Sequence, residues 1–96
     1  MKKQNTQHVS EALNLWVETL KMKRKVGETR LINSWESVVG SYIASKTSVI
    51  YIKERKLFVK IDSSVVRNEL MLAKMLLIKR LNESVGNELI DDIVLK

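Results

Sequence analysis

Aromatic and basic residues are interleaved over residues 46–60 in a pattern that could bind nucleic acid. Tyr51 and Phe58 stand among lysines and an arginine in two strand-like segments. Rings stack on bases and cations pair with backbone phosphates, which is the chemistry of a single-stranded nucleic-acid platform. The alternative is that the two rings form a cross-strand pair covered by the first helix or by another copy of the chain. The predicted nucleic-acid-binding residues of this segment are Lys46, Tyr51, Lys53, Arg55, Lys56, Phe58 and Lys60.

A second group of cations follows the first predicted helix. Lys21 and the run Lys23-Arg24-Lys25 would stand at the C-terminal end of that helix. Positive charges there complement the helix dipole. The alternative is a phosphate-binding patch, in which Lys23, Arg24 and Lys25 extend the basic surface.

A third candidate surface lies on the long helix predicted near the C-terminus. Met71, Met75 and Ile78 form an apolar row beside the main apolar stripe of that helix. Such a row could bind a helix of a partner protein. The alternative is that the first helix of the chain buries it.

The sequence offers little to a catalytic mechanism. The single histidine, His8, lies near the start of the chain, so His-based triads and His metal clusters are excluded. Asp91 and Asp92 are adjacent and would point to opposite faces of a strand. Gly27, Gly40 and Gly86 each follow a helical pattern and form no phosphate-binding loop. We therefore predict a non-enzyme with no catalytic residues, no metal and no cofactor.

Charge is unevenly distributed along the 96 residues. Residues 1–60 hold 12 Lys/Arg and 5 Asp/Glu, whereas residues 61–96 hold 5 Lys/Arg and 6 Asp/Glu. The basic half favours an anionic partner, either nucleic acid or the acidic face of a protein. The chain has no cysteine, no signal-peptide pattern and no apolar run long enough for a membrane span, so we expect a cytoplasmic protein.

The hydrophobic periodicity of the sequence predicts the helices and strands that position these candidate residues. We expect a disordered N-terminus over residues 1–8 and one domain over 9–96. Helices are predicted over 9–21, with Val9, Leu13, Trp16 and Leu20 on one face, and over 28–39, with Trp35 as a core residue. Val26-Gly27 separates these two helices, and a connector over 41–48 follows the second.

The second half of the chain predicts a hairpin, a long helix and a last strand. Strands over 49–53 and 56–62 with a Glu54-Arg55 turn would pair Ile50 with Val59 and Tyr51 with Phe58. A helix follows over 64–85, with an N-cap from Asp62, Ser63 or Ser64 and Gly86 after its end. The last strand, within 87–96, has a bulge or starts late, near Asp92. The order is α-α-β-β-α-β, an α+β domain with helices on one face of a three-stranded sheet.

An ordered set of motifs resembles the bacterial DciA-like family of replicative-helicase operators and loaders. The matching segments are WESVVG (35–40), SYIASKT (41–47), LFVKIDSS (57–64), Glu69-Leu70 and LNESVG (81–86). The resemblance implies a type II KH-like fold variant, binding to the replicative helicase, promotion of its loading, and DNA binding. A KH domain clamps nucleic acid with a Gly-x-x-Gly loop, which this sequence lacks, so binding is expected at the basic hairpin. Longer members carry a basic extension linked to helicase engagement, whereas this sequence ends at Lys96, which favours a minimal DNA-binding or adaptor role.

The sequence therefore predicts a non-enzymatic nucleic-acid-binding adaptor linked to replication initiation and helicase loading. Its expected partners are single-stranded or forked DNA and the replicative helicase, and the long helix and small core leave room for a homodimer. The alternative is a protein-interaction module that binds a helicase or another replication protein without touching nucleic acid.

Overall fold

Five helices and three strands make up the part of the chain that the structure describes. The structure is a computed structural model that describes residues 2–96, with side chains from residue 11 onward. The elements are α1 (Lys2–Asn33), α2 (Trp35–Val39), α3 (Ser41–Ser45), β1 (Thr47–Lys53), β2 (Lys56–Ile61), α4 (Ser64–Leu72), α5 (Lys74–Val85) and β3 (Asp92–Leu95). The expected disorder of residues 1–8 stays a prediction, and Met1 and the side chain of His8 lie outside the described set.

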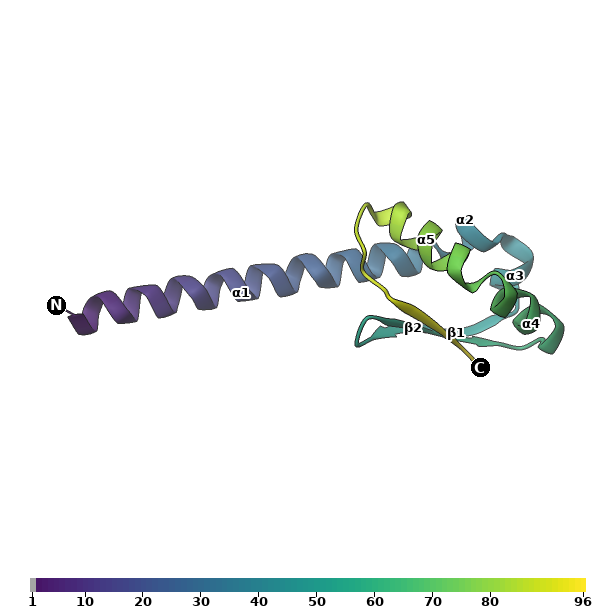
Figure 1. Ribbon diagram of the computed structural model, residues 1–96, viewed down its shortest axis with the longest axis horizontal. Helices are drawn as coiled ribbons and strands as arrows, with labels where there is room; N and C mark the ends of the chain where they lie inside the picture. Colours follow the sequence, from purple (N-terminus) through teal and green to yellow (C-terminus); the bar gives the residue numbers. More distant parts are fainter. Residues whose placement is uncertain (1) are drawn as a thin grey trace.

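The strands form a mixed sheet in the order β1-β2-β3. β1 and β2 are antiparallel, with Ile50 beside Val59 and Tyr51 beside Phe58, so the predicted hairpin register is confirmed. β3 starts at Asp92 and runs parallel to β2. Helices α2, α4 and α5 lie on one side of this sheet (Figure 1). The fold is the predicted α+β class, consistent with a KH-like α-α-β-β-α-β arrangement.

The core lies between the sheet and the helices and is built around β2. Leu57, Val59 and Ile61 are each at most 2% exposed because they alternate onto the helical side of the central strand. Trp35 is 4% exposed, as predicted, and its indole Nε1–H donates a hydrogen bond to Thr47 Oγ1 at 3.0 Å. The other buried apolar residues of the core are Leu31, Val66, Leu70, Leu77, Leu81, Leu89, Ile90 and Ile93.

The predicted break at Val26-Gly27 is wrong, because α1 runs without interruption to Asn33. Glycine costs a helix interior only about 1 kcal/mol relative to alanine. At Gly27 the backbone approaches Leu89 closely: a Cβ there would lie 2.9 Å from Leu89 Cδ1, so the leucine side chain would have to shift. Gly27 is therefore a close-approach site for the segment before β3, and it does not end the helix.

The other helices differ from the prediction at their boundaries. The helix expected over 28–39 is divided between the end of α1 and α2, and residues 41–45 of the expected connector form α3. The helix expected over 64–85 is divided at Ala73 into α4 and α5. Its ends are as predicted: the Ser63 side chain accepts a hydrogen bond from Val66 N, and Gly86 has a left-handed conformation with φ 71°.

The first half of α1 projects away from the rest of the molecule. The structure is 66 Å long and about 20 Å across, and the arm at its N-terminal side accounts for the elongation (Figure 1). The predicted apolar face with Leu13, Trp16 and Leu20 lies on this arm and not on the core, and Trp16 is 62% exposed. Val9 belongs to the same predicted face, but its side chain lies outside the described residues.

Candidate nucleic-acid interface

The side of the sheet opposite the helices carries the predicted aromatic and basic residues. Strand alternation turns Tyr51 and Lys53 of β1, and Lys56, Phe58 and Lys60 of β2, away from the core. All three of these lysines are exposed, and Tyr51 is 43% exposed. We call this surface the outer sheet face; its residues are Val49, Tyr51, Lys53, Lys56, Phe58, Lys60, Val94 and Lys96.

The two rings of the outer sheet face are stacked on each other. The ring centroids of Tyr51 and Phe58 are 4.9 Å apart and the planes differ by 8°. The Nζ of Lys96 lies over the Phe58 ring, 5.6 Å from its centroid. Phe58 is thus flanked by a ring and a cation, whereas Tyr51 belongs to β1 at the edge of the sheet. Tyr51 is therefore the more accessible of the two rings.

Arg55 is held in an ion pair at the tip of the hairpin. Its Nε and Nη2 donate to the two carboxylate oxygens of Asp91, each at 2.8 Å, and Nη2 also donates to the carbonyl of Glu88 at 2.9 Å. The Arg55 carbonyl accepts from the Asp91 amide. Glu54 and Arg55 have positive φ of 51° and 63°, the geometry of a tight two-residue hairpin turn. Arg55 therefore fastens the hairpin to the segment before β3, and its charge is already balanced by Asp91.

A side-chain amide fixes that same segment from the helical side. The Asn82 Oδ1 accepts hydrogen bonds from the amides of Leu89 and Ile90 at 3.0 and 3.1 Å, and Nδ2 donates to the Ile90 carbonyl at 2.9 Å. Asn82 belongs to the LNESVG motif (81–86), which carries part of the family resemblance. Together with Arg55 it sets where β3 begins and hence where Lys96 lies.

Lys46 and the run at residues 23–25 lie outside the outer sheet face. Lys46 follows α3 at the end of the hairpin away from its tip, and its Nζ lies 5.8 Å from the Tyr42 ring centroid. Lys23, Arg24 and Lys25 are in the middle of α1, so the prediction that they complement a helix end is wrong. Three consecutive residues are spread by about 100° each around a helix and do not form one patch. Arg24 pairs with Glu28 at 3.8 Å.

The acidic pair at 91–92 is structural. Asp92 stands beside Lys56 in the sheet, and its Oδ1 accepts from Lys74 Nζ at 2.7 Å. The hydrogen bond from Lys74 lowers the pKa of Asp92, and the hydrogen bond from Arg55 lowers the pKa of Asp91. Among the described residues no cluster of three or more His, Cys, Asp or Glu side chains could hold a metal ion.

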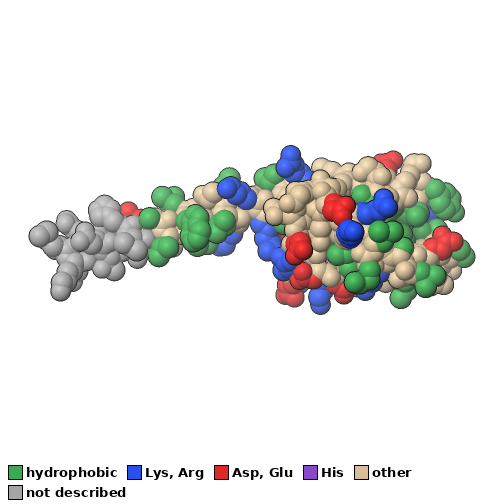
Figure 2. Space-filling view, turned by 45° about the horizontal axis from the view of Figure 1, so that its top comes forward, with side chains coloured by type: hydrophobic (Ala, Val, Ile, Leu, Met, Phe, Trp, Pro, Cys, Tyr) green, Lys and Arg blue, Asp and Glu red, His purple; other side chains and the backbone are tan. Residues whose placement is uncertain are grey.

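The predicted apolar row on the long helix is divided between core and surface. Ile78 packs partly against the core, whereas Met71 is 57% and Met75 82% exposed, so α1 does not bury them. Leu72, which is 91% exposed, and Leu76, which is 51% exposed, lie beside them and were not among the predicted residues. These residues form what we call the helical patch: Met71, Leu72, Met75 and Leu76. Figure 2 shows hydrophobic side chains gathered at the end of the body away from the arm.

The amino-acid sequence matches a known protein family. The model of the family described as "Dna[CI] antecedent, DciA" matches residues 8–95. The chain belongs to the DciA family. This confirms the resemblance read from the motifs, and the DciA family is linked to loading of the replicative helicase in DNA replication.

A curated relative extends the comparison. The DciA-family chain is 33% identical over 61 residues to a UPF0232 protein from Corynebacterium glutamicum (strain R). The match covers 64% of this chain and 34% of the relative, so the chain spans about a third of that protein. No solved structure matches the chain. Within the described residues, none of the helices combines the length and apolar character needed to cross a membrane.

The ion pair at the hairpin tip predicts a pH-dependent stability. A carboxyl whose pKa is lowered in the folded state stabilises it fully above the unfolded pKa, about 3.9 for Asp, and that contribution is lost as pH falls through the folded pKa. We therefore expect wild type to melt at a higher temperature than Asp91→Asn at neutral pH. This gap between the two melting temperatures should shrink below about pH 4. It should be small, because both side chains are partly exposed.

Thermal melts of both proteins across pH 2.5–7.5 in about 20 mM salt measure this gap, since low salt keeps the ion pair unscreened. Glu36→Gln, which removes an exposed carboxylate of α2, is the control. An equal gap at pH 3 and pH 7 would contradict the assignment of Asp91 as the charged partner of Arg55.

Proposed function

We propose that this DciA-family chain is a non-enzymatic DNA-binding adaptor in loading of the replicative helicase, acting in the cytoplasm. In this proposal residues 9–96 form one domain that holds single-stranded or forked DNA on the outer sheet face. The observation that carries the proposal is an uncovered sheet face on which exposed lysines surround the stacked pair of Tyr51 and Phe58.

The spacing of the lysines supports an anionic ligand. Lys53 and Lys56 are paired directly across the two strands, where like charges repel, and Asp92 beside Lys56 offsets part of that repulsion. Lys56 and Lys60 flank Phe58 at two residues on either side, about 7 Å along the strand. A phosphate backbone running along the strands would place successive phosphates beside the Lys53/Lys56 pair and beside Lys60.

The aromatic pair supports a single-stranded ligand. Bases of a duplex are stacked on one another and cannot reach a protein ring, whereas an unpaired base can stack on the accessible ring of Tyr51. Phe58 would then pack against the opposite face of the Tyr51 ring and would not itself stack on a base. Since the sequence has no Gly-x-x-Gly loop, the ligand would be held by side chains on the strands and not by a backbone clamp.

Charge reversal on the outer sheet face tests the proposal. We expect Lys53→Glu/Lys60→Glu to weaken binding of a fluorescent oligothymidylate at least tenfold at constant salt. The slope of log affinity against log salt should fall by about 1.4, because each single-strand phosphate contact contributes about 0.7. Fluorescence anisotropy at several salt concentrations measures both quantities.

The matched control is Lys79→Glu/Arg80→Glu, which changes the net charge equally on exposed positions of α5. It should weaken binding less than threefold. If both variants lose the same affinity, binding follows net charge alone and the outer sheet face is not the site.

A second candidate function is suggested by the helical patch, which we propose as the contact with the replicative helicase. Leu72 and Met75 are the most exposed large apolar residues on α4 and α5. They lie on the helical layer, on the other side of the sheet from the lysines. One chain could then hold DNA on one face and the helicase on the other, as an adaptor requires.

Paired variants separate the two surfaces. Leu72→Ser/Met75→Ser should abolish retention of the purified host helicase in a pull-down and leave oligothymidylate binding unchanged. Lys53→Glu/Lys60→Glu should show the reverse pattern. Leu72 and Met75 are both exposed, so we expect little loss of folding stability in the first variant. Undiminished helicase retention by the Leu72/Met75 variant would exclude the helical patch.

A further inference from the structure

The projecting arm of α1 carries an apolar stripe with nothing packed on it in the described part of the chain. Leu13, Trp16, Val17 and Leu20 are 51, 62, 43 and 46% exposed. We call these four residues the arm stripe. Figure 2 shows hydrophobic side chains along the arm between its grey end and the body.

The arm stripe continues the side of α1 that packs on the body. Leu20 and Leu31 are eleven residues apart, which at 3.6 residues per turn places them within about 20° of each other around the helix. Leu31 is fully buried, and Gly27, on the same side, meets Leu89. The side of α1 that seals the core therefore extends to the arm stripe, with Lys23 and Arg24 at the turn between Leu20 and Gly27.

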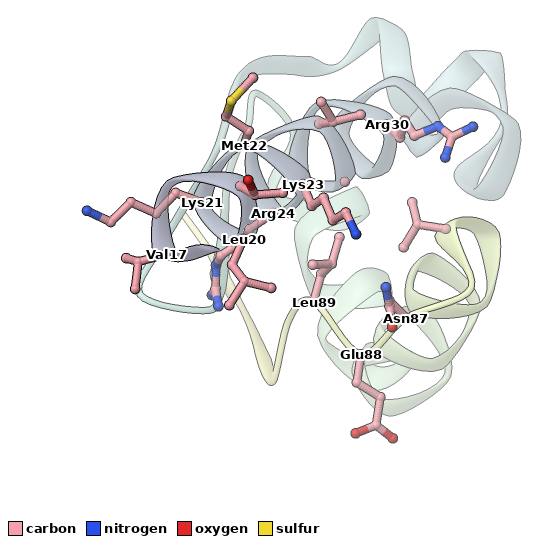
Figure 3. A pocket seen from close by; sticks show the side chains of 14 residues that line it. Val17, Leu20, Lys21, Met22, Lys23, Arg24, Arg30, Asn87, Glu88 and Leu89 are labelled. Carbon is pink, nitrogen blue, oxygen red and sulfur yellow. The ribbon is translucent and has the colours of Figure 1, made fainter. Parts of the chain in front are cut away.

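A groove connects the arm stripe to the body. It has a volume of about 1040 Å³ and lies between α1 and the loop that follows α5. Val17, Leu20 and Leu89 contribute to its apolar lining (Figure 3). A helix laid against the arm stripe would therefore meet a continuous floor, formed by α1 along one side and by this loop at the body end.

The projecting arm of α1 needs a packing partner, because isolated helices are marginal in water and are stabilised chiefly by packing of an apolar face. The arm stripe is self-complementary. Its members lie symmetrically about a point between Trp16 and Val17, so reversing the helix places Leu13 on Leu20 and Trp16 on Val17. This symmetry is what a two-fold interface between identical chains requires.

The charges beside the arm stripe favour one orientation of two such helices. Its flanks are uncharged in the first half, with Ala12 and Asn14, and cationic in the second half, with Lys21 and Lys23. A parallel pair would place the cations of one copy beside those of the other. An antiparallel pair places Lys21 beside Ala12 and separates the cationic halves, so it avoids the repulsion.

We propose that a second copy of this chain covers the arm stripe and that two α1 arms pack as an antiparallel pair centred between Trp16 and Val17. The two bodies then lie at opposite ends of a shared two-helix rod, and each keeps its own sheet face free. Four apolar side chains per copy make a small interface, so we expect dissociation constants in roughly the micromolar range. This proposal does not depend on DNA binding.

Sedimentation of the full chain over a concentration series tests for the dimer. Wild type should change from 11.1 kDa toward twice that mass between about 1 and 500 μM, a range that brackets a micromolar constant. Leu13→Ser/Leu20→Ser should stay monomeric throughout. The matched control is Leu15→Ser/Met22→Ser, which removes two more exposed apolar residues on the opposite side of the same helix and should dimerise like wild type.

Cross-linking determines the orientation, since the chain has no natural cysteine. An equimolar mixture of Leu13→Cys and Leu20→Cys proteins should oxidise mainly to the mixed disulfide. Predominant disulfides between identical variants would indicate a parallel pair and overturn the proposal. So would a wild type that stays monomeric at every concentration, in which case a different protein covers the arm stripe, or equal dimer loss in the Leu15/Met22 control.

Discussion

The architecture depends on one constraint, that the central strand of a three-stranded sheet can be covered on only one side by so short a chain. β2 meets this constraint by strict alternation, with Leu57, Val59 and Ile61 under the helices and Lys56, Phe58 and Lys60 on the other side. A one-residue shift in its register would bury lysines and expose the core. The same alternation that builds the hydrophobic core thus creates the basic, aromatic face that we propose as the DNA surface.

Polar contacts from Arg55 and Asn82 hold the segment before β3 in place. Arg55 binds Asp91 and the Glu88 carbonyl from the hairpin, and Asn82 binds the backbone of residues 89 and 90 from α5. Between them they fix a segment that has little regular structure of its own, and Gly27 lets that segment approach α1 closely. An arginine that the sequence presents as one more phosphate ligand is thereby used to position the strand that carries Lys96.

Much of the fold could be predicted because it follows from local periodicity. Alternation predicted the Tyr51–Phe58 pairing, and the main apolar stripe indicated the helix over 64–85, whose two parts are α4 and α5. The errors arise where a distant contact decides. Gly27 reads as a helix end, but Leu89, 62 positions later in the sequence, makes it a packing site. Likewise the partner of Arg55 and the place of Lys96 depend on β3 running beside β2, which no local pattern shows. The stripe around Trp16 was recognised, but its exposure depends on where α1 meets the body.

Amide and side-chain NMR of the isotopically labelled chain, titrated with an oligothymidylate, would show directly where DNA binds. We expect chemical-shift changes to concentrate on β1 and β2, with the largest side-chain changes on Lys53, Lys56 and Lys60, and intermolecular NOEs from thymine protons to the Tyr51 ring. Shift changes confined to α1 or to the helical patch, with the Tyr51 ring unaffected, would contradict this expectation.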